Sequence, residues 1–270
     1  NLVVQKPWGS EYIVCQNKTS ATWLLNLEYN KKTSLHCHPK KKTGFILLDG
    51  KVEVMLGFYE RKILNSPSKL TIRPGLFHST KALSKNGATI LEIETPIDKH
   101  DLVRFKDDYG RENTPYEGIK KMTKKTKRDF IFEIPKKTGV NNYKFKDLKI
   151  SLETHITTSE LIKRPKNTIF AILDGGLVDQ KKRYVLSPGD IVQTETIAKL
   201  SKVFKINKKM SILTCKKIWS MNKKNILKIF ETASLCRHFE INAYSNIKEK
   251  KINIPVSLSA GQEFIASTLA

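Results

Sequence analysis

The sequence predicts an all-β protein made of two barrels of one type, followed by a short helical segment. The first hundred residues consist of short apolar or alternating runs separated by turn residues, with almost no helical periodicity. The same pattern returns after residue 128, where Phe170–Gly175 matches Phe45–Gly50 in order and spacing. Apolar residues recur at helical spacing only in the stretch Asn225–Ala243.

The first barrel is expected to contain nine strands. Asp49-Gly50 lies between two apolar runs and is a strong hairpin signal, and Asn65–Ser68 and Pro74-Gly75 mark two further turns. The predicted strands are Glu11–Cys15, Thr22–Tyr29, Thr33–His38, Gly44–Leu48, Val52–Gly57, Glu60–Leu64, Leu70–Arg73, Phe77–Ala82 and Thr89–Glu94.

Strand-like runs continue through the second half to about Ile218. Arg73-Pro74-Gly75 is matched there by Ser187-Pro188-Gly189, with a shorter hairpin between the matched turns. A lysine-rich stretch, IKKMTKKTKR, separates the copies and is typical of a linker or a solvated surface segment. We therefore predict a first barrel over 1–118, a linker over 119–128, a second barrel over 129–220 and a helical tail over 221–270.

Three histidines in the first barrel have the pattern of a metal site. Side chains alternate along a strand, so His36 and His38 project from one face while Cys37 points to the other. His78 follows the Pro74-Gly75 turn and would be delivered by a distant strand. Imidazole binds several transition ions, so the ligand type does not choose among Zn, Fe, Mn and Ni.

This pattern resembles the two motifs of the cupins, in which His-x-His is followed by a Glu and a Gly and later by Pro-x-x-x-His. The resemblance implies double-stranded β-helix (jelly-roll) barrels, the first holding a divalent metal ion. The family's usual Glu ligand corresponds here to Thr43, so the fourth position is open or is filled by a carboxylate from another strand. Glu92 and Glu94 share one face of a strand and are candidates.

The second copy has lost the ligands. When positions are counted from Phe170 as from Phe45, Leu161, Lys163 and Val192 stand where the histidines would be. We expect a degenerate second barrel that holds no metal.

Two further motifs narrow the class of substrate expected for the first barrel. Lys6-Pro7-Trp8-Gly9 with Glu11, and the run Asp101–Arg111, resemble the start and the end of the cupin domain of bacterial mannose-6-phosphate isomerases, including those fused to mannose-1-phosphate guanylyltransferases. The resemblance implies metal-assisted chemistry on a phosphorylated sugar or a sugar nucleotide. The candidate proton-transfer residues are Glu92, Glu94 and Lys42, and the candidate phosphate-binding residues are Arg73, Arg104 and Lys40, each of which could instead be an ordinary exposed charge.

The tail has its own resemblance. Arg237-His-Phe239-Glu240, Ile254-Pro255 and Gly261-Gln262-Glu263 are similar to the start of a thiamine-diphosphate-dependent E1 alpha subunit. Thiamine diphosphate would be bound only by a downstream domain, so the resemblance implies a C-terminal fusion.

Composition limits the partners. The formal charge of +23 comes from lysines spread along the whole chain without interleaved aromatic residues, which argues against a nucleic-acid platform. No apolar run is long enough to cross a membrane, and four scattered cysteines fit a reducing, cytoplasmic setting. A homodimer is compatible with the sequence.

Three functions fit these features. The first is a metal-dependent isomerase or epimerase in carbohydrate or surface-polysaccharide biosynthesis. The second is a non-catalytic module that binds a sugar nucleotide for a fused thiamine-type enzyme. The third is a metal-dependent dioxygenase, which a three-histidine site with open positions allows.

Overall fold

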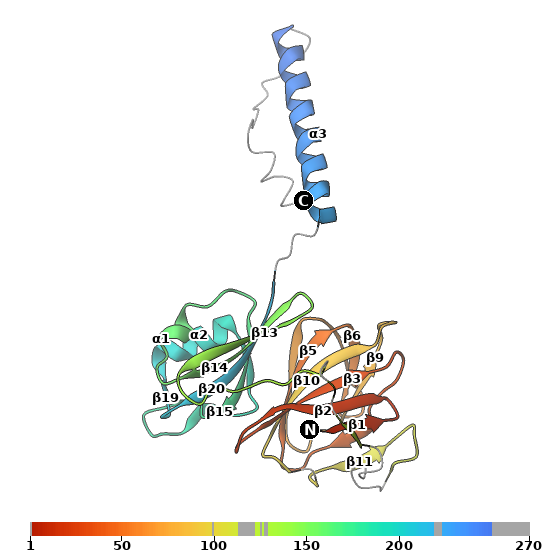
Figure 1. The fold of residues 1–270 in the computed structure, drawn as a ribbon, viewed down its shortest axis with the longest axis vertical. Helices are drawn as coiled ribbons and strands as arrows, with labels where there is room; N and C mark the ends of the chain where they lie inside the picture. The colour runs from red at the N-terminus through yellow and green to blue at the C-terminus, as the bar shows by residue number, and fades with distance from the viewer. Residues whose placement is uncertain are drawn as a thin grey trace. The chain divides into compact units, whose positions relative to one another are not determined.

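The computed structural model describes residues 2–98, 100–112, 122–124, 126, 129–218 and 223–249. The chain divides into two compact units, Asn1–Ile218 and Trp219–Ala270. The first unit contains two barrels, called barrel 1 (2–112 with 122–124) and barrel 2 (129–218) (Figure 1). No helix in the described ranges combines the length and the apolarity that crossing a bilayer requires.

Barrel 1 consists of two antiparallel sheets with the strand orders β12-β1-β2-β3-β10-β5-β8 and β11-β4-β9-β6-β7. All nine predicted strands are confirmed. The strands of the larger sheet are β1 (Leu2–Lys6), β2 (Gly9–Gln16), β3 (Ala21–Leu27), β5 (Lys42–Asp49), β8 (Ser68–Ile72), β10 (Ala88–Thr95) and β12 (Met122–Lys124). Those of the smaller sheet are β4 (Leu35–Cys37), β6 (Lys51–Leu56), β7 (Glu60–Asn65), β9 (His78–Ala82) and β11 (Val103–Lys106).

The two sheets of barrel 1 enclose an apolar core. Alternate residues of β6 are buried, as period-2 patterning requires, and they meet the inward residues of β3, β5 and β10. Gly9 makes the first hairpin possible, because it has φ of +140° and a Cβ there would lie 1.9 Å from the Asn26 carbonyl oxygen.

Barrel 2 repeats the larger sheet in the order β13-β14-β20-β15-β18, which matches β2-β3-β10-β5-β8 strand for strand. Phe170 pairs with Thr214 and Val192, as Phe45 pairs with Glu92 and Leu70. This register confirms two barrels of one type. The strands are β13 (Gly139–Phe145), β14 (Leu148–His155), β15 (Ile169–Asp174), β16 (Leu177–Val178), β17 (Tyr184–Leu186), β18 (Ile191–Gln193), β19 (Lys205–Ile206) and β20 (Met210–Lys217).

The smaller sheet of barrel 2 has only the described strands β17-β16-β19. In chain order, helix α1 (Ser159–Ile162) stands where barrel 1 has β4, and helix α2 (Thr194–Val203) precedes β19. The expectation of strands throughout this half was wrong at these two points. The strand register corrects one equivalence: Val192 pairs with Phe170 as Leu70 pairs with Phe45, so Val192 corresponds to Leu70 and not to His78.

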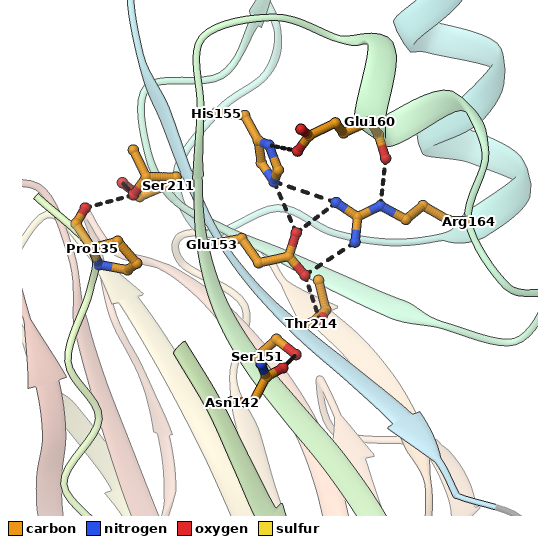
Figure 2. A network of polar contacts seen from close by, with 10 residues as sticks. Pro135, Asn142, Ser151, Glu153, His155, Glu160, Arg164, Ser211 and Thr214 are labelled. Atoms are coloured by element: carbon orange, nitrogen blue, oxygen red, sulfur yellow. Dashed lines mark hydrogen bonds and ion pairs between the residues drawn. The ribbon is translucent and has the colours of Figure 1, made fainter. Parts of the chain in front are cut away.

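A polar network in barrel 2 surrounds Glu153 (Figure 2). Glu153 on β14 is buried and accepts hydrogen bonds from His155 Nε2 at 2.8 Å and from both terminal nitrogens of Arg164 at 3.1 and 2.5 Å. Burial alone would raise the pKa of Glu153, but the hydrogen bonds from His155 and Arg164 outweigh it and lower the pKa. Leu161 of α1 is fully buried in the apolar core. The residue that the sequence comparison matched to His36 is therefore a core leucine.

The barrels share a second apolar cluster. Ile46 and Ile93 point away from the interior of barrel 1 and pack in one cluster with Ile150 and Leu213 of barrel 2. A Cβ at Gly44 would lie 2.8 Å from the Ile191 side chain, so the glycine permits this close approach. Within the predicted linker, Met122–Lys124 forms strand β12 on β1, and most of its neighbours lie outside the described residues.

The second unit is described as one helix, α3 (Lys223–Lys248), which confirms the predicted helical tail. The residues Ile254-Pro255 and Gly261-Gln262-Glu263, on which the thiamine-type resemblance largely depended, lie outside the described residues.

Candidate metal centre

The three histidines converge inside barrel 1. His36 on β4 pairs directly with His78 at the start of β9, and His38 follows two residues later on the same face as His36. Their ring centroids are 4.4 to 5.6 Å apart. One ring nitrogen from each residue lies within 4.8 Å of the other two, close enough for all three to share an ion.

Each imidazole is oriented by a backbone carbonyl. The Nδ1 atoms of His36, His38 and His78 lie 2.8, 2.5 and 3.0 Å from the carbonyl oxygens of Ser34, Asp101 and Leu76. A carbonyl oxygen only accepts, so each Nδ1 carries the proton and donates it. The three Nε2 lone pairs are therefore left for a metal ion, as in many protein metal sites.

The protonation state of the three histidines is also the one that metal binding requires. Burial is the largest cause that lowers the pKa of all three histidines, to about 4 for His38 and His78, and the neighbouring imidazoles lower that of His36 further. The neutral rings are the form that binds metal. The residues thus fit a divalent transition ion, and nothing in the donor set chooses among Zn, Fe, Mn and Ni.

Two carboxyl groups face the same space. Glu92 and Glu94 on β10 each place an oxygen within 4.8 Å of one another and of a ring nitrogen of His38. Lys41 Nζ donates to Glu94 at 3.0 Å, whereas Glu92 makes no hydrogen bond or ion pair with another described residue. Burial and the charges of Glu94 and Glu11 raise the pKa of Glu92 to about 8.

The segment after β10 completes the site. The buried Asp101 carboxylate accepts from the backbone N–H groups of Lys40 and Lys41 at 2.8 to 3.1 Å, while its own carbonyl holds His38. Arg104 on β11 lies directly opposite His36 in the register of β11 against β4. Arg111 binds Asp107 through Nε at 2.9 Å and a terminal nitrogen at 2.7 Å. Burial would raise the pKa of Asp107, but these bonds lower it.

The barrel is a double-stranded β-helix of the cupin type. Its site lies between the two sheets, in a cavity with four basic and three acidic side chains in its lining. The basic residues are Lys6, Lys41, Arg104 and Arg111, and the acidic residues are Glu11, Glu92 and Glu94.

Comparisons with known proteins find no family and only weak likenesses to solved structures. No protein-family profile matches the chain, and no curated protein does. Among solved structures, the chain resembles KdgF from a Halomonas species at 16% identity, with 36% of this chain and 88% of that one covered and a TM-score of 0.34. It also resembles the capsular polysaccharide assembling protein CapF from Staphylococcus aureus at 13% identity, with 40% and 35% covered and a TM-score of 0.36.

A third similar structure is an uncharacterized conserved protein with a double-stranded β-helix domain from Klebsiella pneumoniae. It is 13% identical, with 36% of this chain and 84% of that one covered and a TM-score of 0.33. Likenesses this weak carry no information about what the cupin barrel binds, so its chemistry has to be derived from its own residues.

The structure brings only some of the other predicted site residues to the cavity. Glu92, Glu94 and Arg104 line the cavity, but Lys42 does not. Its Nζ lies 2.8 Å from Ser187 Oγ and 2.9 Å from Asp190 Oδ1 of barrel 2. Adjacent strand residues point to opposite faces, and Lys41 is the one that points inward.

Arg73 and Lys40 are exposed and lie outside the cavity lining, so the prediction that they hold phosphate finds no support in their placement. The sequence reasoning missed Lys41, and it gave Lys6 and Glu11 no site role although they form an ion pair of 3.1 Å in the cavity wall. Alternation with the inward Thr43 and Phe45 was the signal that could have identified Lys41.

Proposed function

We propose that the cupin barrel is a metal-dependent enzyme that acts on a phosphorylated sugar or a sugar nucleotide, with isomerase- or epimerase-type chemistry. The observation that carries the proposal is the convergence of three Nε2 lone pairs, with the Glu92 carboxyl group close to one of them, that of His38. Proton transfer between adjacent carbons requires both an electrophile at the oxygen and a base at the carbon.

His36, His38 and His78 would hold the ion. A bound divalent ion would supply Lewis-acid polarisation of a substrate carbonyl oxygen. Glu92, which no described residue holds in a hydrogen bond, would take a proton from one carbon and return it to the neighbouring carbon. Glu94 is held by Lys41 and is less able to move.

The charge of the cavity favours an anionic substrate. Lys6–Glu11 and Lys41–Glu94 are paired within the lining, Arg111 is paired with Asp107, and the other basic and acidic residues of the lining are Arg104 and Glu92. A bound divalent ion would make the net sign of the cavity positive. A phosphate or diphosphate group would be attracted to such a site. Arg104 is the nominee for a direct contact, because a guanidinium matches two phosphate oxygens.

The test measures interconversion of mannose 6-phosphate and fructose 6-phosphate by metal-loaded protein, followed by a panel of sugar nucleotides. We expect turnover that a chelator abolishes, that His36→Ala abolishes, and that Glu92→Gln lowers by about 100-fold or more while metal remains bound. Glu53→Gln is the matched control, because Glu53 is a strand residue of the same barrel that is paired with Arg61 outside the cavity. Binding without turnover, or full activity in Glu92→Gln, would overturn the catalytic proposal.

A further inference from the structure

We propose that Glu94 is the carboxylate ligand of the metal, supplied by β10 in place of the position that Thr43 occupies on β5. The inference rests on the metal site of the proposed function and assigns its fourth protein ligand.

The two possible ligand groups share one residue, His38. His36, His38 and His78 form one group, and His38 with Glu92 and Glu94 forms the other. His38 donates its Nδ1 proton to the Asp101 carbonyl, so Nε2 is its one available donor atom. A single lone pair binds a single ion, so an ion bound at His38 Nε2 would have the two carboxyl groups as its neighbours.

The sheet register distinguishes the two carboxylates. Glu94 is the direct cross-strand partner of Thr43, whereas Glu92 is opposite Phe45. Directly opposed side chains share a face with Cβ atoms about 5 Å apart, so Glu94 reaches the space that a longer side chain at position 43 would reach.

Lys41 supports the assignment. Its ammonium group is buried and donates to Glu94 Oε1 at 3.0 Å, which leaves Oε2 for the ion. Ligating carboxylates are commonly oriented by a hydrogen bond of this kind. Glu92 has no such partner among the described residues, which suits a group that must carry a proton rather than one that holds a metal.

Thr43 gives an independent indication. Its side chain is almost completely buried, and its Oγ1 atom has no hydrogen-bond partner among the described residues. A hydroxyl group in that state beside Glu94 points to a polar ligand at this side of the cavity.

The test uses Co²⁺ as the probe, with affinity measured by chelator competition and coordination by visible absorption. We expect Glu94→Gln to weaken Co²⁺ binding by at least about 100-fold and to change the absorption spectrum, because loss of a ligand should cost more than the 10- to 100-fold of an outer contact. Glu92→Gln and Glu53→Gln should keep both the affinity and the spectrum. Adding Thr43→Glu to Glu94→Gln should restore binding, since it returns a carboxylate from the opposing strand.

Wild-type affinity and spectrum in Glu94→Gln, or their loss in Glu92→Gln instead, would overturn the assignment. Thermal unfolding of each variant checks that it is folded. The two proposals fail separately: an inactive wild type that binds Co²⁺ through Glu94 contradicts only the enzymatic function, whereas an active Glu94→Gln variant with unchanged Co²⁺ binding contradicts only the ligand.

Discussion

Asp101 holds the metal site together at two points. Its carbonyl oxygen orients His38, and its carboxylate fixes the backbone of Lys40 and Lys41. Asp101 therefore positions a metal ligand through its backbone carbonyl, and through its side chain it positions the lysine that holds Glu94.

Asp101→Ala keeps the carbonyl but frees the backbone of Lys40 and Lys41, so we expect it to loosen both His38 and the Lys41–Glu94 contact and to weaken metal binding by about 10- to 100-fold. Affinity is measured by chelator competition, and thermal unfolding is measured in parallel. Asp108→Ala is the control, because Asp108 belongs to the same segment but forms an exposed ion pair with Lys32. Equal affinities in the two variants would show that Asp101 has no positioning role.

Asp107 and Arg111 form a buried ion pair, in which the Asp107 side chain is fully buried. Asp107→Ala removes the carboxylate that accepts two hydrogen bonds from the buried Arg111 guanidinium, so we expect it to lower the free energy of unfolding by about 3 kcal/mol. Denaturant unfolding is the measurement. Asp179→Ala removes a pair with the same spacing, Asp179–Arg183, that is exposed, and it should leave stability close to that of the wild type.

The sequence predicted the three histidines because period-2 alternation and the Pro-Gly turn are local signals. It did not predict which lysine enters the cavity, because the choice between Lys41 and Lys42 depends on the strand's register against its neighbours. Arg111 was noted only as part of a motif, since its bond to Asp107 depends on a turn that residue types do not specify.

At the scale of elements, barrel 2 shows how a strand that carries ligands can be replaced. Helix α1 stands in place of β4, and Leu161 fills the core. The network around Glu153 joins β14, the end of α1 and β20 through His155, Arg164 and Thr214 (Figure 2). Its ion pairs connect β14 to the segment after α1, and in barrel 1 the strand β4, which carries His36, stands in the place of α1.

Glu153→Gln should destabilise the protein by about 3 kcal/mol at pH 7, because Arg164 loses its buried partner. The folded-state pKa of Glu153 is lowered, so its stabilisation is complete above the unfolded pKa of about 4.3 and is lost as the pH falls through the folded value. The difference in stability between the wild type and the variant should therefore begin to shrink as the pH falls below about 4.3 and vanish below the folded-state pKa.

Urea unfolding between pH 3 and pH 7 measures this dependence. Glu160→Gln is the control, because Glu160 contacts His155 but its side chain is 62% exposed. A constant difference between wild type and Glu153→Gln across this range would contradict the role of the carboxylate.

The strands of barrel 1 were predictable because their alternation and turn residues are local. Helices α1 and α2 were missed, although Thr194, Ile197 and Ser201 of α2 are buried at helical spacing. A four-residue helix such as α1 is too short for its period to be distinguished from that of a strand.

At the scale of the whole first unit, the barrels pack through a shared apolar cluster. Gly44→Ala would place a Cβ 2.8 Å from Ile191 and 2.9 Å from the Gly189 carbonyl oxygen, so we expect a loss of about 1–3 kcal/mol of stability. Gly139→Ala, where a Cβ meets nothing closer than 3.7 Å, is the control and should be close to neutral. Equal thermal stability in both variants would contradict this packing.

The most direct test of the metal centre is the metal content of the purified protein after loading and dialysis. We expect about one divalent ion per chain in the wild type, and its loss in His36→Ala, His38→Ala and His78→Ala. His100→Ala, which removes an exposed imidazole outside the cavity lining, should leave the content unchanged. Undiminished metal content and affinity in His78→Ala would contradict a centre in which β4 and β9 bring three imidazoles to one ion.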